Sequence, residues 1–218
     1  MFGNVFLATQ LIREAYLNRE LRKLFHERAF IQRVVVPVVK DLTSLTQQPD
    51  PLQNSGYRFV ELKPDDLQTG KWNFSVRSRY FKALRKIKKG MRGFALVKDT
   101  TVVGDIWCVA PSDQKNPIDH PDLRMLGIAC KKGDAYAMDI FIDPAYREYK
   151  LGAPTLLSLQ LMLKQEGWHR LYAYYYDDNI PSKWMHWMLK FTELPKLQVS
   201  RFFFFTKTHK NAKKNDQI

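Results

Sequence analysis

The stretch FIDPAYREYKLGAPTLLSLQ, residues 141–160, joins an apolar strand end to a helix through a charged turn. Proline is tolerated at the first position of a helix, where its missing N–H has no helical partner, so Pro154 marks the helix start. The first amides of a helix carry partial positive charge, and Arg147 and Lys150 add full charges. These residue types suit a phosphate or pyrophosphate group. An ordinary strand-to-helix turn is the alternative that the residues alone leave open.

A known family motif has the same pattern. The stretch resembles motif A of the GCN5-related N-acetyltransferases (GNAT), in which a strand ending V-x-P-x-x-R is followed by R/Q-x-x-G-x-G/A and a long helix. Ile142, Pro144 and Arg147 match the first part, and residues 147–152 overlay the second. Lys150 stands where the family has its first glycine.

A second family pattern lies downstream. Members often read N-x-x-A, with a Tyr seven residues after the Asn and then Gly-Phe, and Asn179, Ser182, His186 and Phe191 fall at these offsets. The predicted order of elements over residues 57–207 is also similar: strand, two helices, hairpin, strand, motif A, strand, helix, strand. The resemblance therefore implies an α/β (α+β) fold, a GNAT-like mixed and mostly antiparallel sheet flanked by helices.

The resemblance also implies a co-substrate, acetyl-CoA. Backbone groups of Phe141 and Ile142 would pair with the pantetheine arm, the turn amides would hold the pyrophosphate, and Asn179 would bond the pantetheine amide. The implied coenzyme-binding residues are Phe141, Ile142, Arg147, Tyr149, Lys150, Leu151, Gly152, Ala153 and Asn179. The side chain of Lys150 either narrows the turn or reaches a phosphate.

Acyl transfer to an amine needs a neutral nucleophile, and a lysine-like amine with a pKa of about 10.4 is mostly protonated at neutral pH. Many family members carry a Glu six residues before the Ile142 position, where this chain has Tyr136. Strand alternation places Asp139 on the face opposite to Tyr136. Tyrosine is a weak base, so we expect a water relay through Asp139 or Asp105, although a strand carboxylate is as often a structural acceptor.

The leaving thiolate needs a proton, which the family usually supplies from a Tyr in the helix after the fifth strand. His186 occupies that place, and an ordinary histidine pKa near 6.5 suits proton donation. The candidate catalytic residues are His186, Asp139 and Tyr136. Alternatives are a histidine that merely packs between Trp184 and Trp187, and Tyr174, Tyr175 or Tyr176 as the acid.

Composition indicates a packed, strongly basic protein. The 218 residues include 35 Lys and Arg against 22 Asp and Glu, a formal charge of +13, which favours polyanions as partners. Two cysteines and five scattered histidines show no metal-ligand spacing, so we expect no metal. The first residues do not resemble a signal peptide and no window has about 18 apolar residues, so we expect a cytoplasmic protein.

Periodicity predicts one long basic amphipathic helix over residues 7–36. Such a helix docks on the core, pairs with a second subunit to form a homodimer, or adsorbs to an anionic membrane surface. We expect residues 1–45 to form this N-terminal extension, 46–56 a linker, 57–210 the GNAT-like acyltransferase domain, and 211–218 a flexible basic tail.

The stretch SVRSRYFKALRKIKKGMRG predicts a second basic helix, with no acid among its cations to relieve their mutual repulsion. A solvated face and an anion-facing role are both open. Further on, GFALVKDTTVVGDIWCVA is typical of a β-hairpin, and LGIAC suggests an extra strand.

The leading hypothesis is an acyl-CoA-dependent N-acyltransferase that transfers acetyl from acetyl-CoA to a primary amine of an acceptor, with an anionic acceptor suited to the charge. The alternative is a non-catalytic module of the same fold that binds nucleic acid or an anionic membrane surface through its basic helices. The missing glycine and the missing glutamate favour the alternative.

Overall fold

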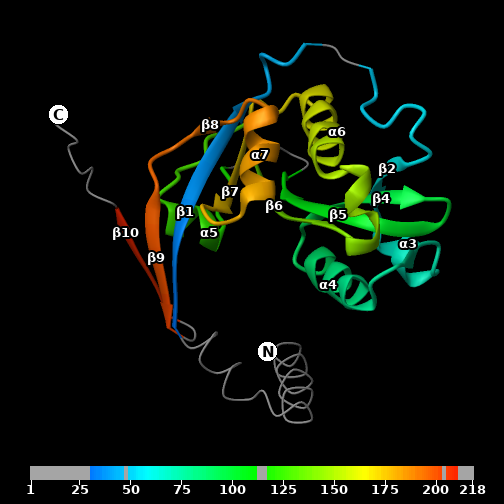
Figure 1. Ribbon diagram of the computed structural model, residues 1–218, viewed down its shortest axis with the longest axis horizontal. Coiled ribbons are helices and arrows are strands. Elements are labelled where there is room, and N and C mark those ends of the chain that lie inside the picture. Colours follow the sequence, from blue (N-terminus) through cyan, green and yellow to red (C-terminus); the bar gives the residue numbers. More distant parts are fainter. Residues whose placement is uncertain (1–29, 47–48, 112–116, 203–204, 211–218) are drawn as a thin grey trace, which may run out of the picture. The chain divides into compact units, whose positions relative to one another are not determined.

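Residues 30–46, 49–111, 117–202 and 205–210 are described by the computed structural model (Figure 1). Its contacts divide the chain into two units, one of residues 1–35 with 196–218, and one of residues 36–195. Strand β1 (Phe30–Asp41) has residues in both units. All candidate site residues lie in the larger unit.

The larger unit is built on a mixed sheet in which β1 is followed, in hydrogen-bonded order, by β7, β6, β5, β4 and β2. The pairs β2–β4, β4–β5 and β5–β6 are antiparallel, whereas β6–β7 is parallel. These strands are β2 (Arg58–Leu62), β4 (Arg92–Lys98), β5 (Thr101–Val109), β6 (Asp134–Ile142) and β7 (Arg170–Tyr176). Two short strands, β3 (Asn73–Phe74) and β8 (Thr192–Glu193), pair with β5 and β1. The predicted fold class is confirmed.

Helices cover both faces of this sheet, with α6 and α7 on one side and α3 and α4 on the other (Figure 1). The alternation of β7 decides which residues face which helices. Leu171, Ala173 and Tyr175 pack with α6 and α7, while Tyr172 packs on the other face with Leu123 of α5. The helices are α3 (Pro64–Gln68), α4 (Arg77–Ile87), α5 (Pro121–Leu126), the 3₁₀ helix η1 (Pro144–Tyr149), α6 (Gly152–Gln165) and α7 (Ile180–Met188). The predicted hairpin is β4–β5.

The predicted N-terminal helix is wrong over residues 30–36, which belong to strand β1. Val35, Val36 and Val38 are completely buried. Neighbouring β-branched residues that are all buried are typical of a strand covered on both faces, and this burial overrides the helical spacing of the preceding residues. Residues 1–29, to which the dimer and membrane predictions also apply, lie outside the described residues.

The smaller unit contains an antiparallel sheet of β1, β9 (Leu197–Phe202) and β10 (Phe205–Lys210). Its register pairs Phe30 with Phe202 and Val35 with Leu197. The sequence SRFFFFTKT contributes to both β9 and β10. The predicted tail of residues 211–218 lies outside the described part of the chain.

The extra strand predicted at LGIAC is also wrong. Leu126 ends α5, and Gly127, with φ of 66°, closes that helix in the left-handed conformation that glycine adopts without strain. The ring nitrogen Nδ1 of His120 accepts a hydrogen bond from the backbone N–H of Asp122 and so caps the other end. No helix among the described residues has the length and apolar character needed to cross a membrane.

Candidate active site

Strands β6 and β7 diverge beyond their first residues. Their parallel pairing runs from Asp134 opposite Arg170 to Tyr136 opposite Tyr172 and stops there, although β6 continues to Ile142. The second half of β6 therefore has backbone groups on its β7 side that do not belong to a ladder. An extended ligand can pair with such groups as an added strand would.

A β-bulge interrupts the same half of β6. Asp105 pairs with Phe141 and Trp107 with Met138, so Asp139 and Ile140 together face Ile106 alone. Asp139 adopts a φ of 56°, in the left-handed region. The extra residue resets the alternation, so that Met138 and Asp139 both reach the side of α4. The expected placement of Asp139 on the face opposite to Tyr136 is thus wrong.

The carboxylate of Asp139 is held by three cations of α4. Its oxygens lie 3.2 Å from Arg79 Nη1, 2.7 Å from Lys82 Nζ and 2.6 Å from Lys86 Nζ. Burial disfavours the charged form, but the charges of Lys86 and Arg79 outweigh burial and lower the pKa of Asp139 to about 2. Asp139 is therefore ionised at neutral pH and is a weak proton acceptor.

Arg79 also connects α4 to Asp105 of β5, whose side chain is almost fully buried. Arg79 Nε donates to Asp105 at 2.8 Å, its Nη2 donates to the same carboxylate, and Trp107 Nε1 donates at 2.7 Å. The guanidinium lies 4.7 Å from the ring centre of Phe141. The acids that relieve the repulsion within the basic helix thus come from the sheet.

Tyr136 is completely buried on the α5 side of the sheet. Its hydroxyl donates to Asp122 Oδ2 at 2.7 Å. Burial, and after it the charge of Asp122, raises the pKa of Tyr136 well above its ordinary value. At neutral pH this side chain keeps its proton and links β6 to α5.

His186 lies on the other face of the sheet, in α7, so it is not brought together with Tyr136. Its Nδ1 lies 2.7 Å from the carbonyl oxygen of Ser182 and carries the proton of that hydrogen bond. The ring stacks on Tyr175 at 5.4 Å and meets Phe191 edge-on at 4.8 Å. Burial lowers the pKa of His186, against the opposing effect of the Ser182 carbonyl, so the ring is mostly neutral at pH 7.

Asn179 caps the N-terminus of the helix that carries His186. Its Oδ1 accepts a hydrogen bond of 3.2 Å from the backbone N–H of Ser182. Asn179 thus accepts a hydrogen bond from the backbone N–H of Ser182, and His186 donates one to the carbonyl oxygen of the same residue. Together these bonds fix the first turn of α7. The cap stabilises a helix end by about 1 kcal/mol.

The turn between β6 and α6 has the backbone that the phosphate hypothesis requires. After η1, Lys150 adopts a φ of 52°, the left-handed region that glycine enters without strain. This conformation gives a physical reason for the glycine of the family motif. Leu151 is buried beneath the turn and anchors it. The side chain of Lys150 is exposed.

Helix α6 then begins at Gly152 with no side-chain cap. The amides of Gly152 and Ala153 have no acceptor within the helix, because they belong to its first turn. Arg147 Nε donates to the carbonyl of Ile142 at 3.3 Å, which holds this side chain near the end of β6. The turn can therefore offer an anion several backbone donors together with two cations.

The sequence interpretation did not single out Arg79, Lys82 and Lys86, the three cations that hold Asp139. Their spacing of three and then four residues places them on one face of a helix, and that signal was available. This spacing could not predict their partner, because Asp139 is more than 50 residues away in sequence. Within the described part of the chain, no group of three or more His, Cys, Asp or Glu side chains is arranged to hold a metal ion.

No protein-family model matches this chain, and no curated protein matches it in sequence. Solved structures do match. A GCN5-related glucosamine N-acetyltransferase region of a fungal multi-domain GH3 β-N-acetylglucosaminidase superposes with a TM-score of 0.57 at 11% identity, covering 84% of this chain and 22% of that one. A GCN5-related N-acetyltransferase from Sphaerobacter thermophilus superposes with a TM-score of 0.50 at 10% identity, covering 87% of this chain and 56% of that one.

The chain has the GNAT fold. In this GNAT fold, motif A corresponds to the end of β6, η1 and the start of α6. The chain spans about a fifth and about half of the lengths of the two proteins.

Proposed function

We propose that the protein is an acyl-CoA-dependent N-acyltransferase that moves an acetyl group from acetyl-CoA to a primary amine. The observation that carries the proposal is the combination, within a GNAT fold, of a diverging β6–β7 pair and an uncapped helix start next to it. A ligand with an extended arm would pair with the free side of β6, and an anionic group joined to that arm would reach the start of α6. Acetyl-CoA has both the arm and the anionic group.

The coenzyme would lie along the second half of β6 and end at α6. Backbone groups of Phe141 and Ile142 would pair with the pantetheine arm, and the amides of residues 149–153 would hold the pyrophosphate. Arg147 and Lys150 would add positive charge. Asn179 would form a hydrogen bond with the pantetheine amide while its side chain also caps α7.

In the reaction, the thioester C–S bond breaks and a C–N bond forms, the amine loses a proton and the coenzyme leaves as a thiol. His186 as the acid and Asp139 or Tyr136 in the path of the amine proton stay predictions. The pKa of Asp139, about 2, makes a direct transfer to it unfavourable. We therefore assign Asp139 the role of fixing α4 beside the reaction centre, with water accepting the proton.

An acceptor with a negative charge suits the α4 side of the site. Arg79, Lys82 and Lys86 meet two carboxylates, Asp105 and Asp139, so the cluster keeps an excess of one positive charge. Arg77, Lys88 and Lys89 on and after the same helix are exposed. Charges of one sign raise the local concentration of an oppositely charged substrate.

Titration of the full-length protein with acetyl-CoA tests the proposal. A ligand at 100 times its Kd raises the free energy of unfolding by about 2.7 kcal/mol, which a thermal-shift assay detects. The informative variant is Gly152→Asp, which places a carboxylate where the pyrophosphate would lie. A Cβ at Gly152 meets Met185 Sδ at an ordinary 3.5 Å, and an acid in the first turn favours the helix, so the fold should be retained.

We expect wild type and Gly152→Ala to bind acetyl-CoA and Gly152→Asp to lose binding at least tenfold. Equal binding by all three proteins would contradict the proposed position. The lack of any shift with acetyl-CoA or longer acyl-CoA would contradict the coenzyme itself.

The second candidate is a non-catalytic module of the same fold, favoured by the engagement of Asp139, a candidate for the proton relay, with three cations. A nucleic-acid role predicts that affinity falls steeply with salt, because bound phosphates release counterions. A membrane role predicts that vesicle binding needs residues 1–29. These are the residues to remove, since a deletion to 45 would also remove β1.

A further inference from the structure

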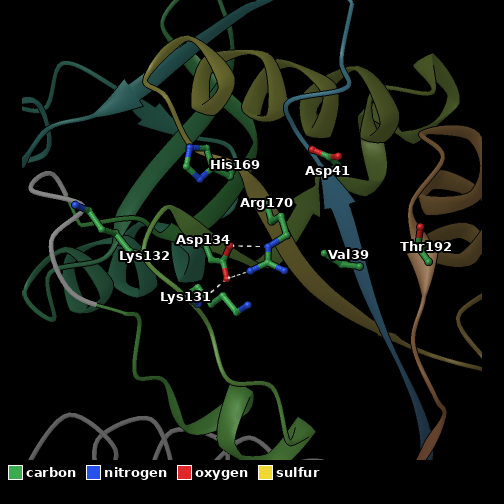
Figure 2. Close-up of a pocket in the computed structure, with 8 residues that line it drawn as sticks. All are labelled: Val39, Asp41, Lys131, Lys132, Asp134, His169, Arg170 and Thr192. Atoms are coloured by element: carbon green, nitrogen blue, oxygen red, sulfur yellow. Dashed lines mark hydrogen bonds and ion pairs between the residues drawn. The ribbon is translucent and has the colours of Figure 1, made fainter.

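A cavity of about 500 Å³ opens at the end of β6 opposite to the candidate active site (Figure 2). It lies where β6 and β7 begin, at Asp134 and Arg170. A strand of nine residues with a rise of about 3.3 Å per residue separates its ends by roughly 26 Å. The cavity is therefore separate from the turn after Ile142. Its lining residues are Val39, Asp41, Lys131, Lys132, Asp134, His169, Arg170 and Thr192.

Arg170 is held in a fixed orientation in this lining. Its Nε and Nη2 donate to the two oxygens of Asp134 at 2.8 and 2.9 Å, and Asp134 is 1% exposed. The backbone N–H of Lys131 donates to the same carboxylate at 2.6 Å. Figure 2 shows the guanidinium in the middle of the lining, between Asp134 and Val39. This bidentate pair leaves Nη1 without a hydrogen-bond or ion-pair partner in the described part of the chain, and the guanidinium lies 5.6 Å from the ring centre of Tyr172.

Cations outnumber carboxylates around the cavity. Lys131 and Lys132 are exposed and form no ion pair with any described residue. The opposing carboxylates are Asp134, which Arg170 neutralises, and Asp41. Asp41 accepts hydrogen bonds from the backbone N–H of Thr43 at 2.9 Å and from its hydroxyl at 2.6 Å, and these bonds lower its pKa. The lining keeps an excess of one positive charge.

An arginine fixed by a buried carboxylate, next to exposed lysines, is suited to a phosphate group, because the planar guanidinium can donate two parallel hydrogen bonds while lysines add point charges. A cavity of this volume holds a small molecule. We propose that it binds a small phosphorylated metabolite, whose phosphate contacts Arg170 and Lys131, at a site distinct from the coenzyme site.

The test uses inorganic pyrophosphate as the probe, in calorimetry on the full chain. The proposed coenzyme turn also attracts pyrophosphate, so the titration is done in the Gly152→Asp background, which removes that turn as a binding site. The test variant is Lys131→Ala with Lys132→Ala. The matched control is Lys63→Ala with Lys183→Ala, which removes the same charge from two exposed lysines that neither proposed site uses.

We expect the Gly152→Asp protein to bind pyrophosphate, the Lys131/Lys132 variant to lose at least tenfold in affinity and the Lys63/Lys183 control to stay within twofold. Equal losses in both double variants would show that bulk charge binds the probe and would overturn the proposal. Loss of binding through Gly152→Asp alone, or binding of an oligonucleotide without any binding of pyrophosphate, would overturn it as well. None of these results depends on acetyl-CoA binding.

A further variant separates an anion site from an unspecific cavity. Asp41→Asn removes one of the two negative charges at the cavity without changing the size of the side chain. We expect pyrophosphate affinity to rise about threefold, as the loss of a partly screened repulsion predicts. Unchanged or weaker binding would contradict the placement of the probe beside Asp41.

Discussion

Strand β6 carries two aspartates that the structure uses differently. Asp134 lies in the regular part of the strand, is 1% exposed and pairs with the one guanidinium of Arg170. Asp139 lies in the bulge, is 24% exposed and is shared by three cations of α4. In the regular ladder, Asp134 fixes the side chain of Arg170 beside a cavity. In the bulge, the carboxylate of Asp139 turns toward α4 and binds three of its cations. The backbone around an acid therefore decides which role it takes.

The largest expected effect concerns the bulge end. Arg79→Ala leaves Asp105 buried without its cation and removes one partner of Asp139. Breaking a buried ion pair from one side typically destabilises by about 3–5 kcal/mol. Urea unfolding should show a loss of this size. Arg77→Ala, on the exposed face of the same helix, should change the free energy of unfolding by less than about 0.5 kcal/mol. Similar losses for both would contradict the special position of Arg79.

A second prediction uses pH. Because the folded pKa of Asp139 is about 2, below its unfolded value, its contribution is complete above about pH 4 and is lost as pH falls through 2. The shift corresponds to about 2 kcal/mol. Asp139→Asn should therefore be about that much less stable than wild type at pH 5–7, and the two unfolding curves should converge near pH 2. A constant difference between them across this range would rule out titration of Asp139 as its source.

A smaller effect is expected at the turn after β6. Lys150→Gly relieves a left-handed backbone, which costs a non-glycine residue about 1 kcal/mol, so thermal unfolding should shift upward. It also removes an exposed charge next to the proposed pyrophosphate, so acetyl-CoA should bind two- to fivefold more weakly, as expected for about 0.5–1 kcal/mol. Tighter binding would instead mean that the lysine side chain crowds the coenzyme.

The sequence predicted the fold where local pattern and tertiary burial agree. The stretch GFALVKDTTVVGDIWCVA, whose two apolar runs form the β4–β5 hairpin, is an example. The helix predicted over residues 30–36 is wrong. The helical spacing of apolar residues and the burial of β-branched residues favour different structures there, and burial decides the outcome. The bulge at Asp139 has no signature in the alternation, so the face of its side chain could not be predicted.

The sequence predicted the position of the turn between β6 and α6, but it did not predict the polar contacts of the candidate site. Pro144, Arg147 and Gly152 lie within one local segment, so their spacing carries the geometry. The partners of Asp139 and of Asp134 come from elements that are distant in sequence, and only the packed sheet brings them together. The same reason explains why the cavity beside Arg170 has no motif.

Amide hydrogen exchange in the presence and absence of acetyl-CoA tests the central claim most directly, because it reports both ends of β6 in one experiment. The proposed function predicts slower exchange in residues 138–153 and no change in residues 128–135. Protection that appears only at residues 128–135, or at neither end at saturating acetyl-CoA, would contradict the assignment of the β6–α6 turn as the coenzyme site.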